Sequence, residues 1–434
     1  TGITQVNGSV YGGSNVTIDG KGNGTANTEI NVTGSSVKIS GNIYGGSKYS
    51  QNTENEVTGI INGNTNINIA GTIDTNVYGG GYNTQVSDST NINISGTLTG
   101  DLFGGAYQSY VKQSTNIITT GNLYGNIYGG GENTSNGTSG IGYKQNSEFI
   151  SGTININIKT GTIGKKNTSN NIYGGSKNQN NIDTDKFEEN SYITIGSTEG
   201  SPIIYNTIYG GGINDKLNST NIEVIGNNRN SYLKIYGASN ANSVIKTSNI
   251  TTNGGYISEI YGSGNTVGSV DTTNITLDRS TVQNVYGAGN RNSVKTTNII
   301  AKSGNITNIF GGARDIDTAI ENTNISILGG NITNIYGAGL NNGAKKTNII
   351  ANATTQTSII ENIYGGAKDS GNVNETNVNI LNGSVNNVYG GNQNGGYTIN
   401  SKVNIQKTAE VKNKLFAGGQ NSDIGTSGTN GNAI

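Results

Sequence analysis

Apolar and polar residues alternate over short stretches that recur along the whole chain. Residues 90–94 read Thr-Asn-Ile-Asn-Ile, which places the threonine and both isoleucines on one side of a strand. A Ser-Gly pair then turns the chain, Leu98 begins a second short strand, and a third strand contains Leu102. The same pieces return at 273–287 and 376–390. Because strand side chains change sides at every residue, this period of two predicts strands and no helices.

The third piece of each repeat ends in an aromatic corner: an aliphatic residue, then Tyr or Phe, then two small residues that are mostly glycine. The corner occurs fifteen times, and most copies are 24 to 28 residues apart. A fixed period in this range is typical of a repeat array whose units stack along one axis. The corner aromatics are Tyr11, Tyr44, Tyr78, Phe103, Tyr128, Tyr173, Tyr209, Tyr236, Tyr261, Tyr286, Phe310, Tyr336, Tyr364, Tyr389 and Phe416.

Three short strands in a coil of roughly 25 residues, with β-branched residues inside, predict an all-β parallel β-helix, or β-solenoid. We expect a right-handed winding and about 15 coils, which at ~4.8 Å per coil would make a rod roughly 70 Å long. The whole chain, 1–434, is predicted to be a single β-solenoid. Extra residues between coils predict insertions near 47–64, 132–150 and 176–206. They crowd into the span 130–210, where a protruding patch is expected.

The two halves of the chain differ in the spacing of the aliphatic residues around the second corner. They are four positions apart in the first half, as in Leu98 and Leu102, and three apart in the second, as in Val282 and Val285. Since side-chain direction has a period of two, a spacing of three requires one residue fewer in the corner. We therefore expect the cross-section to change shape between Ile208 and Ile235.

Composition narrows the class of protein. The chain has 69 Gly and one Pro, and its 31% of hydrophobic residues are periodic, which argues against disorder. The net charge is −1 without a basic run, so no nucleic-acid partner is expected. No apolar stretch is long enough for a transmembrane helix, so membrane insertion of this segment is not expected. Because the chain starts at Thr1 and contains no Met, we expect a processed or trimmed piece.

The repeated tyrosines are the candidates for a binding or stacking column. Each follows an inward-pointing aliphatic residue, so its ring is expected outward or at the corner. The rings could stack on one another, which is the interpretation we favour, or on the flat faces of sugar rings. The candidate residues are Tyr128, Tyr173, Tyr209, Tyr236, Tyr261, Tyr286, Tyr336, Tyr364 and Tyr389.

Asparagine occupies the outward positions beside the isoleucines in coil after coil. Stacked amides could form hydrogen-bond ladders that stabilise the fold, and this interpretation is favoured. The same side chains could instead form a polar carbohydrate-binding face. The positions are Asn66, Asn68, Asn91, Asn93, Asn155, Asn157, Asn377 and Asn379.

Catalysis is not expected. Polysaccharide hydrolases and lyases need carboxylates at set separations or a base with a metal, and this chain has no histidine. The acids after the small pair do not recur from coil to coil, and the best cluster, 314–317, is interpreted as a solvated loop of ordinary surface acids. We therefore predict no catalytic, cofactor-binding or metal-binding residue. These acids are Glu132, Asp215, Asp315, Asp317 and Asp369.

The Thr-Asn-Ile-x-Ile strands and Ile-Tyr-Gly-Gly corners extend over the whole chain, which resembles the β-strand-repeat surface adhesins of bacteria. It is similar in plan to autotransporter passengers and filamentous haemagglutinins. The resemblance implies a secreted or cell-surface rod used for attachment. It is a resemblance of architecture, and no functional residue is transferred from it.

These features predict an extracellular structural or adhesive rod of a bacterial surface, with a carbohydrate or another surface ligand as a partner. The alternatives are a carbohydrate-binding module or a carbohydrate-active β-helix enzyme. The repeat is under way at Val10 and still running at Leu415, without a segment that could cap either end. Either the caps belong to removed parts of a longer protein, or copies associate head to tail into a filament.

Replacing Ile335 with Asp tests the predicted inward side of the strands. An unpaired charge inside the stack should cost several kcal/mol and loosen the neighbouring coils. We expect a clear drop in the thermal midpoint, followed by circular dichroism. A variant that melts like the parent would show that the inward assignment is wrong.

Overall fold

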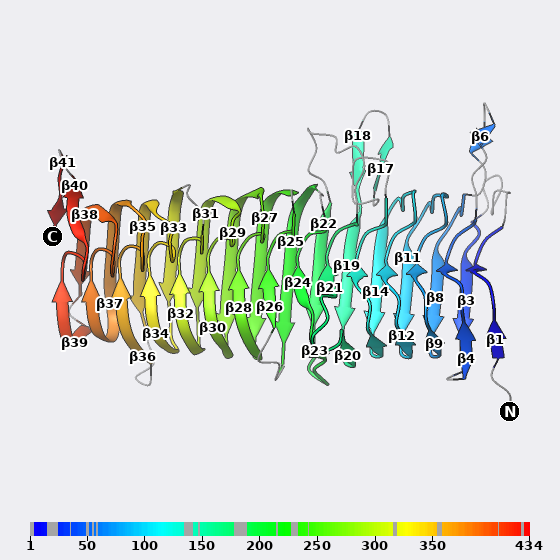
Figure 1. Cartoon of the computed structure of the whole chain (residues 1–434), viewed down its shortest axis with the longest axis horizontal. Helices are drawn as coiled ribbons and strands as arrows, with labels where there is room; N and C mark the ends of the chain where they lie inside the picture. The colour runs from blue at the N-terminus through cyan, green and yellow to red at the C-terminus, as the bar shows by residue number, and fades with distance from the viewer. Residues whose placement is uncertain are drawn as a thin grey trace. The chain divides into compact units, whose positions relative to one another are not determined.

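A computed structural model describes residues 4–14, 25–34, 36–48, 52–53, 56–57, 60–133, 142–145, 148–177, 189–213, 216–226, 233–241, 243–315, 319–353, 358–406, 408–426 and 429–434. Every regular element in these ranges is a β-strand, and the strands pair in parallel from coil to coil except in three short hairpins (Figure 1). This confirms an all-β parallel β-solenoid, with about 12 turns of about 26 residues and so slightly fewer turns than expected. The described residues include no helix of the length and hydrophobicity that membrane crossing requires.

The chain divides into two compact units. The first comprises 1–228 and 239–245, and the second comprises 229–238 and 246–434. The division falls close to the interval 208–235, in which the aliphatic spacing predicts a change of cross-section. A single solenoid through both units stays a prediction.

The first unit has three strands in each turn, as the sequence predicts. One turn consists of β11 (Thr90–Ile94), β12 (Thr97–Leu98) and β13 (Leu102–Phe103), and each strand pairs in parallel with its equivalents in the turns before and after. Equivalent residues lie in register along the unit. Its other strands are β1 (Thr4–Val6), β2 (Val10–Tyr11), β3 (Thr28–Val32), β4 (Val37–Ile39), β5 (Ile43–Tyr44), β6 (Asn52–Thr53), β7 (Glu56–Val57), β8 (Thr65–Ile69), β9 (Thr72–Ile73), β10 (Val77–Tyr78), β14 (Ser114–Thr119), β15 (Asn122–Leu123), β16 (Ile127–Tyr128), β17 (Gly142–Gln145), β18 (Glu148–Ser151), β19 (Thr153–Ile158), β20 (Thr162–Ile163), β21 (Asn171–Tyr173), β22 (Asn190–Ile195), β23 (Ile203–Ile204), β24 (Thr207–Tyr209) and β25 (Lys216–Ile225).

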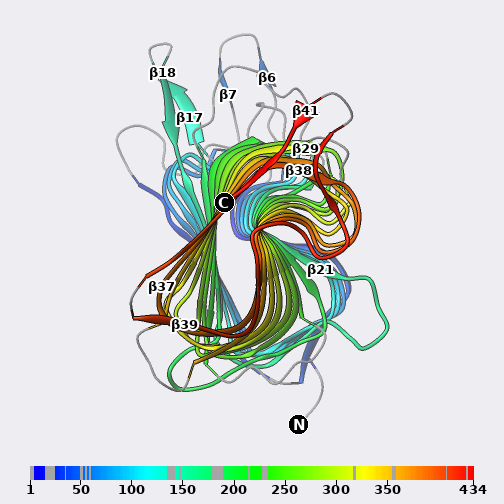
Figure 2. The same cartoon turned by 90° about the vertical axis from the view of Figure 1, so that its left-hand side faces the viewer.

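Most turns of the second unit have two long strands, which differs from the expected three. β30 (Ser280–Tyr286) contains both Val282 and Val285 and follows β29 (Gly268–Asp278) after one residue, Arg279. Because the corner is one residue shorter here, the second and third strands merge into one. Figure 2 shows the end of this unit at β37 and β39. Its other strands are β26 (Lys234–Tyr236), β27 (Ser243–Asn253, whose first three residues belong to the first unit), β28 (Tyr256–Tyr261), β31 (Ser293–Ala301), β32 (Gly304–Phe310), β33 (Ile320–Ile327), β34 (Asn331–Tyr336), β35 (Ala344–Asn352), β36 (Ile359–Tyr364), β37 (Val373–Tyr389), β38 (Tyr397–Ile405), β39 (Ala409–Phe416), β40 (Asp423–Thr426), β41 (Thr429–Asn430) and β42 (Asn432–Ala433).

The core of each unit contains a column formed by the aliphatic residue that precedes each aromatic. In the first unit Val77, Leu102 and Ile127 lie in register and are fully buried. In the second unit Ile335 is buried in the same way between its equivalents in the adjacent turns. This burial confirms the predicted inward side of the strands.

The threonine of each Thr-Asn-Ile strand also points inward and joins two parts of its turn. Thr65, Thr90 and Thr115 are fully buried, and each Oγ1 donates a hydrogen bond of 2.6–2.7 Å to the carbonyl of the first corner glycine, 14 residues later. A buried hydroxyl needs such a partner. The bond ties the first strand of a turn to its aromatic corner. The second unit repeats it at Thr273, Thr297, Thr323 and Thr376.

The first corner glycine is required by the close approach of the next coil. A Cβ placed on Gly45, Gly79 or Gly104 would lie 2.1–2.2 Å from the carbonyl oxygen of the equivalent glycine one turn on. None of the three has a positive φ. Glycine is therefore required here by the lack of space for a Cβ and not by the backbone conformation. The second small position accepts other residues, as at the buried Ala238 and Ser263.

Two antiparallel hairpins interrupt the repeat of the first unit. β6 pairs with β7, and β17 pairs with β18. Figure 1 shows both hairpins extending away from the stacked strands. They lie within the segments 47–64 and 132–150, where insertions are expected. The charged residues 183–188 of the third segment lie outside the described residues.

Replacing Gly129 with Val should destabilise the fold far more than replacing Asn93 with Ser. A Cβ on Gly129 would lie 2.2 Å from Cγ2 of Ile154 and 2.8 Å from the carbonyl oxygen of Gly174. We expect the crowded variant to lose about 3 kcal/mol of unfolding free energy or more. Asn93 is exposed and would lose about 1 kcal/mol with its hydrogen bond to Asn68. Equal shifts in thermal melts would contradict the close approach.

Candidate functional site

The structure gathers the candidate tyrosines of each unit into one stack of parallel rings. In the first unit, neighbouring rings from Tyr11 to Tyr209 have centroids 4.7–5.2 Å apart and interplanar angles of 3–9°. In the second unit, rings from Tyr236 to Phe416 are 4.5–5.4 Å apart at 5–8°. The spacing is that of neighbouring strands, because each ring stands on the same position of successive turns.

Stacking leaves the inner rings without a free face. A ring with a stacked neighbour on both sides offers only its edge and hydroxyl, so a sugar ring cannot lie on its face. The rings lie buried at the corner. A binding role for the column stays a prediction. The candidates with stacked neighbours on both sides are Tyr128, Tyr173, Tyr261, Tyr286, Tyr336, Tyr364 and Tyr389, and all are buried.

Burial also changes the acidity of these phenols. Removal from water disfavours the charged phenolate, and it raises the pKa of Tyr128 and Tyr209 in the first unit and of Tyr286 and Tyr336 in the second. The pKa of Tyr78 is raised by burial first and then by its hydrogen bond to a carboxylate. These five phenols are therefore neutral over the ordinary pH range.

A charged network covers the edge of the aromatic column in the first unit. Glu132 accepts a hydrogen bond of 2.5 Å from the Tyr78 hydroxyl and pairs with Lys177 at 2.9 Å. The Lys177 ammonium lies 4.0 Å from the Asp101 carboxylate and 5.6 Å from the ring centroid of Phe103. Only 13% of the Glu132 side chain is exposed. These residues come from four turns, so the network links the four turns through hydrogen bonds and ion pairs along the axis.

The second unit has an equivalent network built from different residues. Glu259 lies 2.7 Å from Lys234 and 3.9 Å from Arg314. Arg314 Nη1 donates a hydrogen bond of 3.3 Å to the Tyr261 hydroxyl, and Nε lies 3.3 Å from the Asp315 carboxylate. Opposite charges again lie over the edge of the ring stack.

The expectation of ordinary surface acids is therefore wrong for Glu132, which is largely buried and doubly paired. Asp315 is 42% exposed, pairs with the adjacent Arg314 and accepts a hydrogen bond from Asn341 in the next turn. Asp215 and Asp317 lie outside the described residues. In the part of the chain that the structure describes, no three His, Cys, Asp or Glu side chains gather as metal ligands would.

Amide ladders run along the outer side of the strands in both units. In each step the Nδ2 of one asparagine donates to the Oδ1 of its equivalent in the preceding turn, at 2.9–3.0 Å. This is the ladder that the sequence interpretation favours. One ladder joins Asn66, Asn91, Asn116 and Asn155, and another joins Asn274, Asn298, Asn324 and Asn348.

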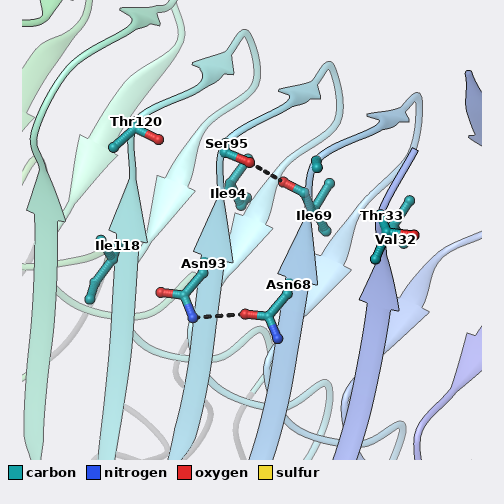
Figure 3. A pocket seen from close by; sticks show the side chains of 10 residues that line it. Val32, Thr33, Asn68, Ile69, Asn93, Ile94, Ser95, Ile118 and Thr120 are labelled. Carbon is teal, nitrogen blue, oxygen red and sulfur yellow. Dashed lines mark hydrogen bonds between the residues drawn. The ribbon is translucent and has the colours of Figure 1, made fainter. Parts of the chain in front are cut away.

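A groove of about 410 Å³ lies across four neighbouring turns of the first unit, where β3, β8, β11 and β14 end (Figure 3). Its lining combines aliphatic side chains with amides and hydroxyls and includes no charged residue. Such a mixture suits a small polar ligand with apolar patches. The lining residues are Val32, Thr33, Asn68, Ile69, Ala70, Asn93, Ile94, Ser95, Ile118 and Thr120.

Sequence reasoning missed the groove and both charged networks. For the groove a signal was present: Ile118 stands at the outward position that Asn68 and Asn93 occupy in the two preceding turns. For the networks no signal was available, because Tyr78 and Glu132 are 54 residues apart and their loops differ in sequence. No family model matches the chain, and neither a curated protein nor a solved structure shows significant similarity to it.

The buried phenols predict a cooperative alkaline transition. The pKa of an exposed phenol is about 10, and burial in the folded state raises the pKa of Tyr128 and Tyr286 above that value. Above pH ~10 the folded protein therefore binds more protons than the unfolded chain. The contribution of the neutral phenols to the free energy of unfolding is complete below pH ~10 and is lost as the pH rises further. We expect the tyrosinate absorbance of the column to appear together with loss of the β-sheet circular dichroism signal.

The variant Tyr128→Phe is the control, since Phe103 already shows that the stack accepts a ring without a hydroxyl. It should reduce the amplitude of the cooperative absorbance step and leave the fold intact. Complete titration of all tyrosines near pH 10 with an unchanged sheet signal would contradict the buried, neutral column.

Proposed function

We propose that this chain is an extracellular structural and adhesive rod of a bacterial surface. The observation that supports it best is that its repeated side chains are used for cohesion along the axis. Rings stack on rings, amides bond to amides, and buried threonines tie each strand to its corner. Each aromatic pair adds about 0.5–1.5 kcal/mol beyond burial, and each amide bond adds about 1 kcal/mol. Because these contributions repeat at every turn, the contacts between turns stabilise the stack against unfolding and against stretching along its axis.

The adhesive part of the proposal rests on the resemblance to β-strand-repeat surface adhesins, and so does the proposed location outside the cell or on its surface. A carbohydrate-binding module is the second candidate function. The groove at Ile118 favours it, because its lining of amides, hydroxyls and aliphatic groups suits a sugar.

Association of copies end to end is part of the proposal. Among the described strands, β39 pairs along one edge only, with β37. Its Leu415 and Phe416 are 51% and 52% exposed, although they continue the aliphatic and aromatic columns of the second unit. At the opposite end of the chain, Tyr11 begins the ring stack of the first unit. An unpaired strand edge with apolar side chains is a template for another chain, and a contact of this kind does not close on itself.

Light scattering over a wide range of protein concentration tests this association. We expect the mean mass of the parent protein to rise with concentration and Phe416→Asp to remain monomeric, because the substitution places a charge in the contact. The matched control is Val267→Asp, at a position that is 71% exposed and away from β39. It should associate like the parent. A parent protein that stays monodisperse at all concentrations would contradict the filament.

A further inference from the structure

The groove coincides with an interruption of the outermost amide ladder. Asn68 Nδ2 donates to Asn31 Oδ1 at 2.8 Å, and Asn93 Nδ2 donates to Asn68 Oδ1 at 2.9 Å. The next turn places Ile118 in register with Asn93, and the turn after that places Asn157 in register with Ile118. The ladder therefore stops at an isoleucine with an asparagine on either side.

The interruption leaves the side-chain oxygen of Asn93 without an amide donor in the next turn. Figure 3 shows Asn93 Oδ1 on the side of its strand that faces the Ile118 strand, where an amide in register would donate to it. An amide oxygen can accept two hydrogen bonds, and leaving it unpaired costs free energy when water is excluded. The Asn93 side-chain oxygen can therefore accept a hydrogen bond from a ligand in the groove.

The isoleucine itself supplies an apolar platform. Ile118 is 38% exposed at an outward position in register with Asn93. The hydroxyls of Ser95 and Thr120 lie along the same groove (Figure 3). An aliphatic surface flanked by amide and hydroxyl groups complements a pyranose ring, which has C–H groups on its faces and hydroxyls around its edge.

The charge of the groove restricts the ligand further. No Asp, Glu, Lys or Arg lines it. An anionic sugar would lose hydration on entering without meeting a compensating charge, whereas a neutral sugar would exchange water for amide and hydroxyl partners. The groove crosses four strands, so its length along the axis is about 14 Å at the usual strand spacing.

We propose that this groove binds a neutral oligosaccharide, with one ring on Ile118 and a sugar hydroxyl donating to Asn93 Oδ1. The site would supply the adhesive contact of the proposed function and in that respect rests on it. The sugar hydroxyls take the place of the missing amide, so the ligand completes the ladder that Ile118 interrupts.

The decisive variant is Ile118→Asn, which restores the amide at the interrupted step. It removes the platform, pairs Asn93 Oδ1 within the protein and should not lower the thermal midpoint. The matched control is Ile350→Asn in the second unit. Ile350 is 39% exposed at the equivalent strand position, in register with Ser326 and Asn379 and away from any groove residue.

The probes are arrayed neutral oligosaccharides of hexoses and N-acetylhexosamines, with oligouronates of equal length for comparison. Affinity for the best neutral probe is then measured by titration calorimetry. We expect the parent to prefer neutral probes, Ile118→Asn to bind at least tenfold more weakly, and Ile350→Asn to bind like the parent.

Equal binding by the parent and Ile118→Asn would overturn the groove assignment and leave adhesion through another surface intact. A preference for oligouronates, or no binding to any probe, would overturn the neutral-sugar inference. Association of copies is measured separately by light scattering, so failure of this site is distinguishable from failure of the structural function.

Discussion

The separation of neighbouring strands, about 4.8 Å, is the constraint on which the rest of each unit depends. Every side chain in a solenoid meets its own equivalent at that distance above and below. Aromatic rings satisfy this spacing by stacking, asparagines by bonding amide to amide, and aliphatic residues by filling a continuous core. Where even a Cβ would meet a carbonyl oxygen of the next turn, as at Gly104, only glycine fits. The restricted composition of the chain follows from this single distance.

Most of the fold could be predicted from the sequence because the constraint is local and repeated. The alternation in 90–94 indicates which residues point inward, and Thr90, Ile92 and Ile94 are all buried. The shorter spacing of Val282 and Val285 indicated a different corner, although it did not reveal that two strands would merge into β30. The merging occurs between Val282 and Val285, where the backbone stays extended through the corner, and no pattern of polarity specifies that conformation.

The candidate site could be predicted only in part, because it depends on differences between turns. The repeated tyrosines were found from their period, but their ring faces cover one another. The networks around Glu132 and Glu259 join loops that do not resemble one another, so their partners become visible only when the turns are stacked in register. Ile118 shows the general rule: the informative residue in a repeat array is the one that departs from its column, because its neighbours are left with unmatched groups.

Diffraction from an aligned specimen tests the stacked-turn account most directly. Strands that lie across the axis and stack along it should give a strong reflection at about 4.8 Å parallel to that axis. Replacing a ring of the column, for instance Tyr128→Leu, should disturb the stacking of the turns. The reflection should become weaker and its spacing should stay unchanged. A pattern without a reflection near this spacing along the axis would contradict the stacked turns, and with them the aromatic column, the amide ladders and the groove.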